Sequence, residues 1–227
     1  MSNIITLLKI QEKDKTRVNV FLDEQFAFAI TLNAALNLRK GQQLSEAEIE
    51  QLKATDERQR AYTKALYFLG FRARSQAEIE QYLREKEYLP PIIEEVVQRL
   101  VAEKYLDDEA FARSWVDSRE QMRPRSSRAL RYELRQKGVN DTVINELVET
   151  VDDDAAAWSA IESKLTRWQA LEQQEFFKKL SGFLGRRGFT YEVVRRIYKR
   201  AWAELDAARN ADVENDATEN DELNEAD

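Results

Sequence analysis

Apolar and polar residues follow two different patterns along the chain. Up to about residue 30, the apolar residues form short β-branched runs at positions 4–10, 17–22 and 26–30. Runs of this length and composition predict three β-strands, which we expect to pair as a small antiparallel meander. A three-stranded meander needs a cover on one face, and residues 32–38 are expected to supply a short helix for it.

A linker helix is predicted after this meander. Ser45 and Glu48 form a capping box, in which each side chain satisfies a free backbone N–H group at the start of a helix. Gly41 separates the box from the meander. We therefore assign residues 1–55 to a small β-rich N-terminal unit with a linker helix.

From residue 56 onward the apolar spacing is that of helices, and the pattern recurs about every 50 residues. Leu83, Leu134 and Leu184 hold the same place in three successive units, and an apolar residue precedes each of them by four positions. A fixed period of this length indicates a repeat array. The predicted units are residues 56–105, 106–152 and 153–205.

Each unit is predicted to contain three helices, the first of them at about 57–69, 108–121 and 155–168. Gly138 and Gly188 lie where a left-handed residue ends the second helix of a unit, and Asp141 and Thr190 suit the N-cap of the third. The predicted fold class is mainly α, with three tandem three-helix repeats forming an elongated, curved array behind a small N-terminal β-meander unit.

Composition excludes several kinds of chemistry. The 227 residues include no Cys and no His, which excludes disulfides, Cys/His zinc sites and catalytic triads built on either residue. No apolar run is long enough for a transmembrane helix, and no basic stretch followed by an apolar region opens the chain. We expect a cytoplasmic protein with no catalytic residues, no metal ion and no cofactor.

The net charge of −7 conceals two basic zones. Residues 206–227 contain nine acidic residues and one Arg, so the other 205 residues carry a net charge of +1. This acidic C-terminal tail has almost no large apolar residues and is predicted to be disordered. Residues 113–137 hold eight basic and three acidic residues, and residues 178–200 hold eight basic residues and one acidic residue.

The first basic zone contains a stripe of arginines. Arg128, Arg131 and Arg135 recur at spacings of three and four, beside the side of a helix that Leu130 and Leu134 mark as buried. Such a stripe suits phosphate, and a solvated face with local ion pairs explains it equally well. The other candidate partner- or nucleic-acid-binding residues of this zone are Arg119, Arg123, Arg125 and Lys137.

The second basic zone follows the same plan on the last two helices. Its surface suits phosphate or an acidic protein groove, and a plain solvent-exposed face is the alternative. The candidate binding residues of this zone are Lys179, Arg186, Arg187, Arg195, Arg196 and Lys199.

Two other features have structural explanations. Aromatic residues lie among the bases, as in proteins that stack single strands, but the spacing of Phe111 and Trp115 favours core packing. Asp107, Asp108 and Glu109 suit the start of a helix, with Asp108 as a cap, better than they suit a metal site.

Three motifs, taken in order, closely resemble the RecX family. They are residues 106–116, 133–139 and 183–189, and residues 72–79 resemble the matching stretch of the first repeat. The resemblance covers about residues 56–203 and implies a cytoplasmic bacterial protein of tandem three-helix repeats. The chain departs from the family at residues 124–127, where a glycine is common, and in its acidic tail.

The resemblance implies a regulatory function without catalysis. Members of the family bind the RecA filament, lie in its helical groove, and inhibit or modulate ATP hydrolysis and strand exchange in recombination, DNA repair and the SOS response. We therefore predict a monomeric regulator whose partner is the RecA filament. The alternative is a module that binds single- or double-stranded DNA directly through its basic helical faces, with a steep dependence on salt.

Overall fold

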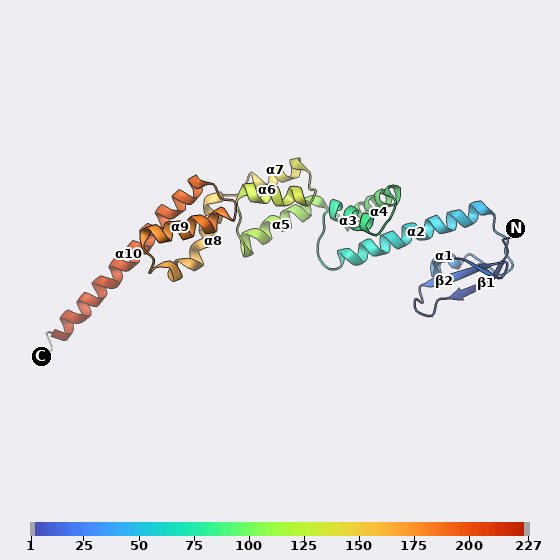
Figure 1. The fold of residues 1–227 in the computed structure, drawn as a ribbon, viewed down its shortest axis with the longest axis horizontal. Helices are drawn as coiled ribbons and strands as arrows, with labels where there is room; N and C mark the ends of the chain where they lie inside the picture. Colours follow the sequence, from blue (N-terminus) through green and yellow to red (C-terminus); the bar gives the residue numbers. More distant parts are fainter. Residues whose placement is uncertain (1–2, 225–227) are drawn as a thin grey trace. The chain divides into compact units, whose positions relative to one another are not determined.

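The structure is a computed structural model in which residues 3–224 are described, with side chains up to residue 210. It divides into two compact units, Met1–Leu106 and Asp107–Asp227. Ten helices and three strands make up the described residues (Figure 1). The predicted fold class is confirmed in its helical repeats and in its small N-terminal sheet.

The N-terminal sheet is an antiparallel meander, as predicted. The strands β1 (Ile5–Ile10), β2 (Arg17–Leu22) and β3 (Gln25–Thr31) lie in the order β1-β2-β3. Alternate residues of β2 point into the core, and an apolar cluster joins them to the short helix α1 (Leu32–Ala35) and to the first turns of α2 (Glu46–Leu69). The two helices therefore provide the cover that a three-stranded sheet needs.

Helix α2 is continuous where the sequence predicts a linker helix and then a separate helix over 57–69. It begins at the predicted Ser45 capping box. The expectation of two helices is wrong because no Gly or Pro interrupts residues 46–69, so the backbone hydrogen-bond ladder runs on.

A buried ion pair fixes α2 to the sheet. Asp56 is 5% exposed, and its carboxylate accepts hydrogen bonds from Arg17 Nη2 at 2.9 Å and from the Thr31 N–H at 2.9 Å. A second bond from Arg17 Nη1, at 3.2 Å, makes the pair bidentate. Such a pair positions two elements because an unpaired charge at this depth is strongly unfavourable.

The first repeat consists of the C-terminal half of α2 with α3 (Gln76–Glu85) and α4 (Pro90–Ala102). Ser75 and Glu78 form a capping box at the start of α3, and prolines occupy the first turn of α4. Between the two helices, Glu87 has a φ of 64°. The same place in the other repeats is held by Gly138 and Gly188, with φ of 73° and 89°, as predicted for left-handed residues.

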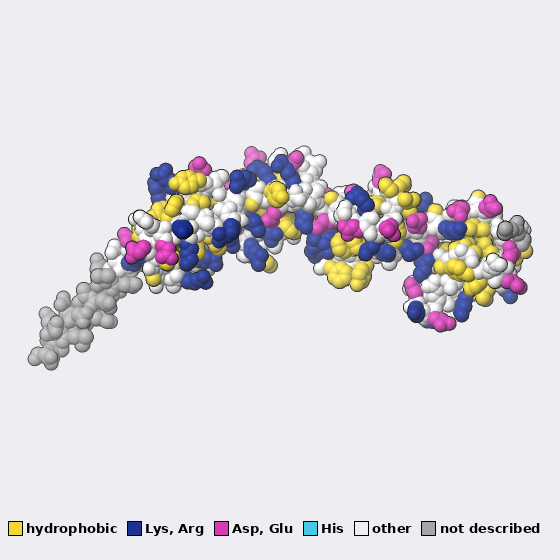
Figure 2. Space-filling view, viewed as in Figure 1, with side chains coloured by type: hydrophobic (Ala, Val, Ile, Leu, Met, Phe, Trp, Pro, Cys, Tyr) yellow, Lys and Arg dark blue, Asp and Glu magenta, His cyan; other side chains and the backbone are white. Residues whose placement is uncertain are grey.

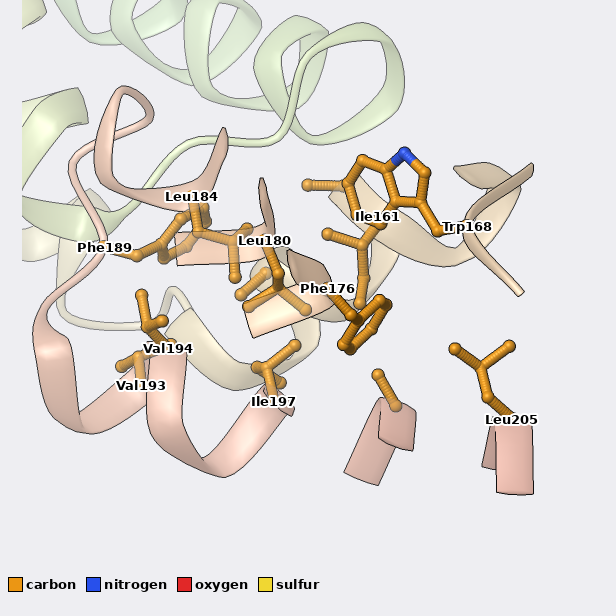
Figure 3. Close-up of a cluster of buried hydrophobic side chains, with 13 residues drawn as sticks. Ile161, Trp168, Phe176, Leu180, Leu184, Phe189, Val193, Val194, Ile197 and Leu205 are labelled. Carbon is orange, nitrogen blue, oxygen red and sulfur yellow. The ribbon is translucent and has the colours of Figure 1, made fainter. Parts of the chain in front are cut away.

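The second unit contains the other two repeats. The second repeat consists of α5 (Asp108–Met122), α6 (Ser127–Gln136) and α7 (Asp141–Val148), and the third of α8 (Asp153–Trp168), α9 (Gln173–Gly185) and α10 (Tyr191–Asn224). Each repeat has its own apolar core, and Figure 3 shows that of the third. The recurring apolar residues are fully buried in all three repeats, which confirms the register: Ile79, Leu83, Leu130, Leu134, Leu180 and Leu184.

Two predicted caps lie one residue away from the observed ones. Asn140 caps α7 in place of Asp141, because its side chain accepts from the Thr142 N–H at 2.8 Å. Asp107 caps α5 in place of Asp108. In both cases the cap is the residue whose backbone is still extended, which spacing alone does not reveal.

Helix α10 continues to Asn224, beyond the end expected near residue 205. The side chains of residues 211–227 and the backbone of residues 225–227 lie outside the described residues. The disordered tail predicted for residues 206–227 begins within this helix, and its disorder stays a prediction.

Candidate basic interface

Helix α6 carries the arginine stripe that its spacing predicts. Leu130 and Leu134 are buried, whereas Arg128 and Arg135 are exposed and Arg131 is half-buried. Arg135 Nε donates to Asp141 Oδ1 at 2.7 Å. Within the described part of the chain, the side chains of Arg128 and Arg131 make no ion pair or hydrogen bond. The stripe is therefore only partly neutralised by the protein itself.

Glu133 anchors the arginines that precede this stripe. Its carboxylate accepts from Trp115 Nε1 at 2.8 Å and from Arg119 Nε at 2.7 Å, and it forms an ion pair with Arg125, whose Nε lies 2.9 Å from Oε1. The Glu133 side chain is 17% exposed. The Arg119 guanidinium also lies over the Trp115 ring, 4.5 Å from the centroid. These bonds fix two of the predicted binding residues in place but use only part of the five N–H donors that each guanidinium carries.

Basic side chains gather on the surface of the third repeat (Figure 2), and they differ in whether an acidic residue pairs with them. Arg196 is paired, because its Nε and Nη2 each donate to Asp154 at 2.7 Å, and the hydrogen bond raises the pKa of Arg196. Among the described residues, the exposed candidates that form no ion pair are Lys179, Arg186, Arg195 and Lys199. An open depression of about 490 Å³ is lined by Gln173, Gln174, Phe177, Tyr191, Arg195, Tyr198 and Lys199.

The turn between α9 and α10 packs tightly against the start of α6. The Ser126 N–H donates to the Arg187 carbonyl at 3.2 Å. A Cβ atom placed on Gly188 would lie 2.7 Å from both Ala129 Cβ and Ser126 Oγ, closer than side chains approach one another. The second and third repeats are therefore joined at this point by direct backbone contact.

Arg187 brings further positive charge to this joint. Its guanidinium lies over the Phe183 ring, 3.7 Å from the centroid. Burial lowers the pKa of Arg187, and the charges of Arg125, Arg186 and Arg123 lower it further. The Arg187 Nε is buried and has no hydrogen-bond partner among the described residues. Arg125 and Arg187 thus adjoin or form the backbone contact between the repeats, and Arg123 and Arg186 lie within two residues of them in the chain.

A base over an aromatic ring recurs at one position of the 50-residue pattern. The distances from base to ring centroid are 5.5 Å for Lys86 over Tyr82, 5.2 Å for Lys137 over Trp115 and 3.7 Å for Arg187 over Phe183. Sequence reasoning assigned the aromatics to core packing, which is correct for the buried Phe111, Phe176 and Phe189. The recurrence was missed, although aligning the three repeats brings the bases into register.

Sequence reasoning also left out two arginines of the first repeat. Arg74 lies over the Phe68 ring at 3.8 Å, and its Nε is buried without a hydrogen-bond partner in the described chain. Arg72 Nη2 pairs with Glu78 at 2.7 Å. The available signal is the Arg-x-Arg-Ser motif, which occurs at residues 72–75 and again at 123–126.

Other kinds of site are not found in the described residues. No three His, Cys, Asp or Glu side chains there are grouped so that they could hold a metal ion. None of the described helices is both long and apolar enough to cross a membrane.

Fold and surface together define a protein of three tandem three-helix repeats behind a small β-sheet unit, with arginine-rich surfaces on the second and third repeats. The chain matches the RecX N-terminal domain at residues 3–45 and the first, second and third RecX three-helix domains at 61–100, 107–147 and 152–198. It belongs to the RecX family of regulatory proteins.

Relatives agree with this assignment, and two solved structures share the fold. The chain is 33% identical over 195 residues to the regulatory protein RecX of Bacillus subtilis, covering 84% of this chain and 74% of that protein. It is 31% identical over 214 residues to the regulatory protein RecX of Listeria monocytogenes, covering 92% and 80%. A crystal structure of regulatory protein RecX has the same fold, with a TM-score of 0.65 at 24% identity over 86% of this chain and 98% of that one. The crystal structure of RecX from Lactobacillus salivarius gives a TM-score of 0.56 at 21% identity over 67% and 99%.

Proposed function

We propose that the protein binds the RecA filament and inhibits or modulates its ATPase and strand-exchange activities in recombination and DNA repair. The observation that carries this proposal is the match to all four RecX domains in order along the chain. The unpaired bases on the second and third repeats support it, because they can pair with acidic groups of a partner or with phosphates of the bound strand. The protein acts as a cytoplasmic monomer and not as an enzyme.

A repeat protein suits a filament as its partner. Repeats carry similar surfaces at regular intervals along the chain, and a filament presents its subunits at regular intervals. Several modest contacts then act together, so that the total affinity exceeds that of any single contact. A regulator bound across neighbouring subunits holds them in one arrangement and blocks the motions that ATP turnover requires. Inhibition is therefore expected well below one molecule of this protein per RecA.

The test is ATP hydrolysis by RecA on single-stranded DNA, titrated with this protein while DNA is kept in excess. Filament binding predicts inhibition that does not recover when more DNA is added. Inhibition that disappears on adding DNA would indicate competition for the strand, and absence of any effect would reject the proposal.

A charge-reversed variant tests the role of the stripe on α6. Arg128→Glu/Arg131→Glu changes two side chains that make no internal ion pair, so the fold is expected to persist. Arg39→Glu/Arg167→Glu is the matched control, since both residues are exposed and it alters the net charge equally. Weaker inhibition by the first variant alone supports the stripe as a contact. Equal inhibition by both variants removes the stripe from the mechanism.

Direct binding of DNA through the basic faces is the second candidate, favoured by the four neighbouring arginines at the joint between the repeats. Binding to single strands then weakens steeply with salt, with a log–log slope of about −0.7 per contacted phosphate. A shallow slope combined with strong inhibition of RecA would reject this alternative as the main activity.

A further inference from the structure

Four arginines flank the joint between the second and third repeats, where the Ser126 N–H donates to the Arg187 carbonyl at 3.2 Å. Arg123 and Arg125 come from the segment between α5 and α6, and Arg186 and Arg187 come from the turn between α9 and α10. Arg125 pairs with Glu133 at 2.9 Å. In the described chain the other three arginines have no acidic partner. Their mutual repulsion opposes the docking of the third repeat on the second.

We propose that this joint is a binding site for a phosphate group, which bridges the arginines of the two repeats and holds them together. Guanidinium groups match phosphate because two parallel N–H donors meet two oxygens. The buried Arg187 Nε has no internal partner to satisfy it. An anion between the four side chains converts their repulsion into attraction on both sides of the joint.

The arginines rather than the end of helix α6 provide the site. Two of the first three N–H groups of α6 already have partners, since the Ser127 N–H donates to Asp153 at 2.6 Å and the Ala129 N–H donates to Ser126 Oγ at 3.1 Å. The positive end of the helix dipole adds only a background attraction for an anion. Asp153 is thereby engaged at the helix start and makes no ion pair with the four arginines.

This inference does not depend on binding to RecA, and it deepens the second candidate function, direct binding of DNA, by naming where a phosphate would bind. The phosphate can belong to a nucleic-acid strand or be free in solution, and both have the same chemistry at the site. In either case binding couples the two repeats, so the joint is more stable with the anion than without it.

Thermal unfolding of the full chain in phosphate and in chloride, at equal ionic strength, tests the site. The cluster variant is Arg123→Gln/Arg186→Gln, one exposed and unpaired residue from each side of the joint. The control is Arg39→Gln/Arg167→Gln, which removes the same charge from two other exposed positions. Phosphate also stabilises proteins generally, and that contribution is common to all three proteins.

The wild type and the control are expected to gain stability in phosphate that the cluster variant lacks. Phosphate at ten times its Kd raises the folding equilibrium constant about tenfold, a shift of roughly 3–6 °C for a unit of this size. In chloride the cluster variant is expected to melt at or above the wild-type temperature, because it removes repulsion. An equal gain in phosphate for the cluster variant and the control would overturn the proposal.

Two further arms identify the ligand. The first measures the affinity for fluorescein-labelled oligothymidylate at several salt concentrations. If a strand phosphate occupies the site, the slope of log affinity against log salt concentration is expected to be shallower by about 0.7 in the cluster variant. An unchanged slope, with the phosphate gain lost, assigns the site to free phosphate. Poly-glutamate that stabilises the wild type as much as phosphate does would show a carboxylate site and reject the proposal. Normal inhibition of RecA by the cluster variant would leave the proposed function intact.

Discussion

Gly188 lies at a close contact between the second and third repeats. Its φ is 89°, and a Cβ atom there would lie 2.7 Å from Ala129 Cβ and from Ser126 Oγ. The substitution Gly188→Ala must therefore push the turn between α9 and α10 away from α6. Because Arg187 is the preceding residue, the same movement displaces its guanidinium from the neighbouring arginines.

The stability lost in Gly188→Ala has two parts, backbone strain and overpacking, and substitutions at two other glycines distinguish them. An L-residue in the left-handed region costs about 1–2 kcal/mol. Gly41 has nearly the same φ, 87°, with no atom within 4 Å of its added Cβ, so Gly41→Ala carries this strain alone. Overpacking adds about 1–3 kcal/mol at Gly188, which gives about 3 kcal/mol in total. Gly182 is helical and its added Cβ meets only the end of Arg186 at 3.4 Å, so Gly182→Ala is expected to stabilise by about 0.5–1 kcal/mol.

Urea unfolding followed by Trp fluorescence measures these differences, because all four Trp residues lie in the second unit with Gly182 and Gly188. With an m-value of about 2 kcal/mol/M, Gly188→Ala lowers the midpoint by about 1.5 M and Gly182→Ala raises it slightly. Circular dichroism, which follows the whole chain, measures the smaller loss in Gly41→Ala. A Gly188→Ala midpoint within about 0.3 M of wild type would refute the close packing of the joint.

Three further substitutions test other contacts. Glu133→Gln removes the charge that holds two arginines and a Trp. It is expected to lower the free energy of unfolding, measured in urea, by about 2 kcal/mol, a value between those for exposed and buried ion pairs. The control Glu109→Gln, whose ion pair is exposed, should change that free energy by less than about 0.5 kcal/mol. Asp56→Asn is expected to cost about 3 kcal/mol in the first unit, and a loss below about 1 kcal/mol in circular dichroism would contradict the buried pair. Hydrogen bonds from Ser45 lower the pKa of Glu48, so the contribution of Glu48 to stability is present above pH 4.5 and is lost as the pH falls further. Glu48→Gln should therefore weaken the fall in melting temperature between about pH 6 and about pH 3. An unchanged fall would count against the capping box.

Much of the fold could be predicted because its signals are local. The recurring leucines are buried in every repeat, since a helix can bury only the residues on one face, and that face recurs with the helical period. The strands followed from short β-branched runs in the same way. The continuity of α2 was missed, although the absence of Gly and Pro over residues 46–69 indicates it. The pairing of Asp56 with Arg17, 39 residues earlier in the chain, has no local signal.

The candidate site was predictable in its residue types but not in its pairings. Spacing identified the exposed arginines of α6, yet acids that are distant in the sequence decide which arginines are neutralised. Arg196 pairs with Asp154, 42 residues away, and Arg119 pairs with Glu133 on the next helix. The joint between the repeats depends on Gly188 meeting Ala129, a contact between residues that no short-range pattern connects. These contacts exist only once the repeats have packed.

The pairings separate bases that support the fold from bases that are free to bind. Arg119 already holds a hydrogen bond that a partner would have to replace, so binding it gains little. Arg128 has no such bond to lose. Arg123 and Arg186 differ from both, because they repel other charges in the free protein and a bound anion relieves that repulsion. At the joint, stability and binding are therefore opposed: removing one of these charges is expected to stabilise the free protein and to weaken its hold on phosphate.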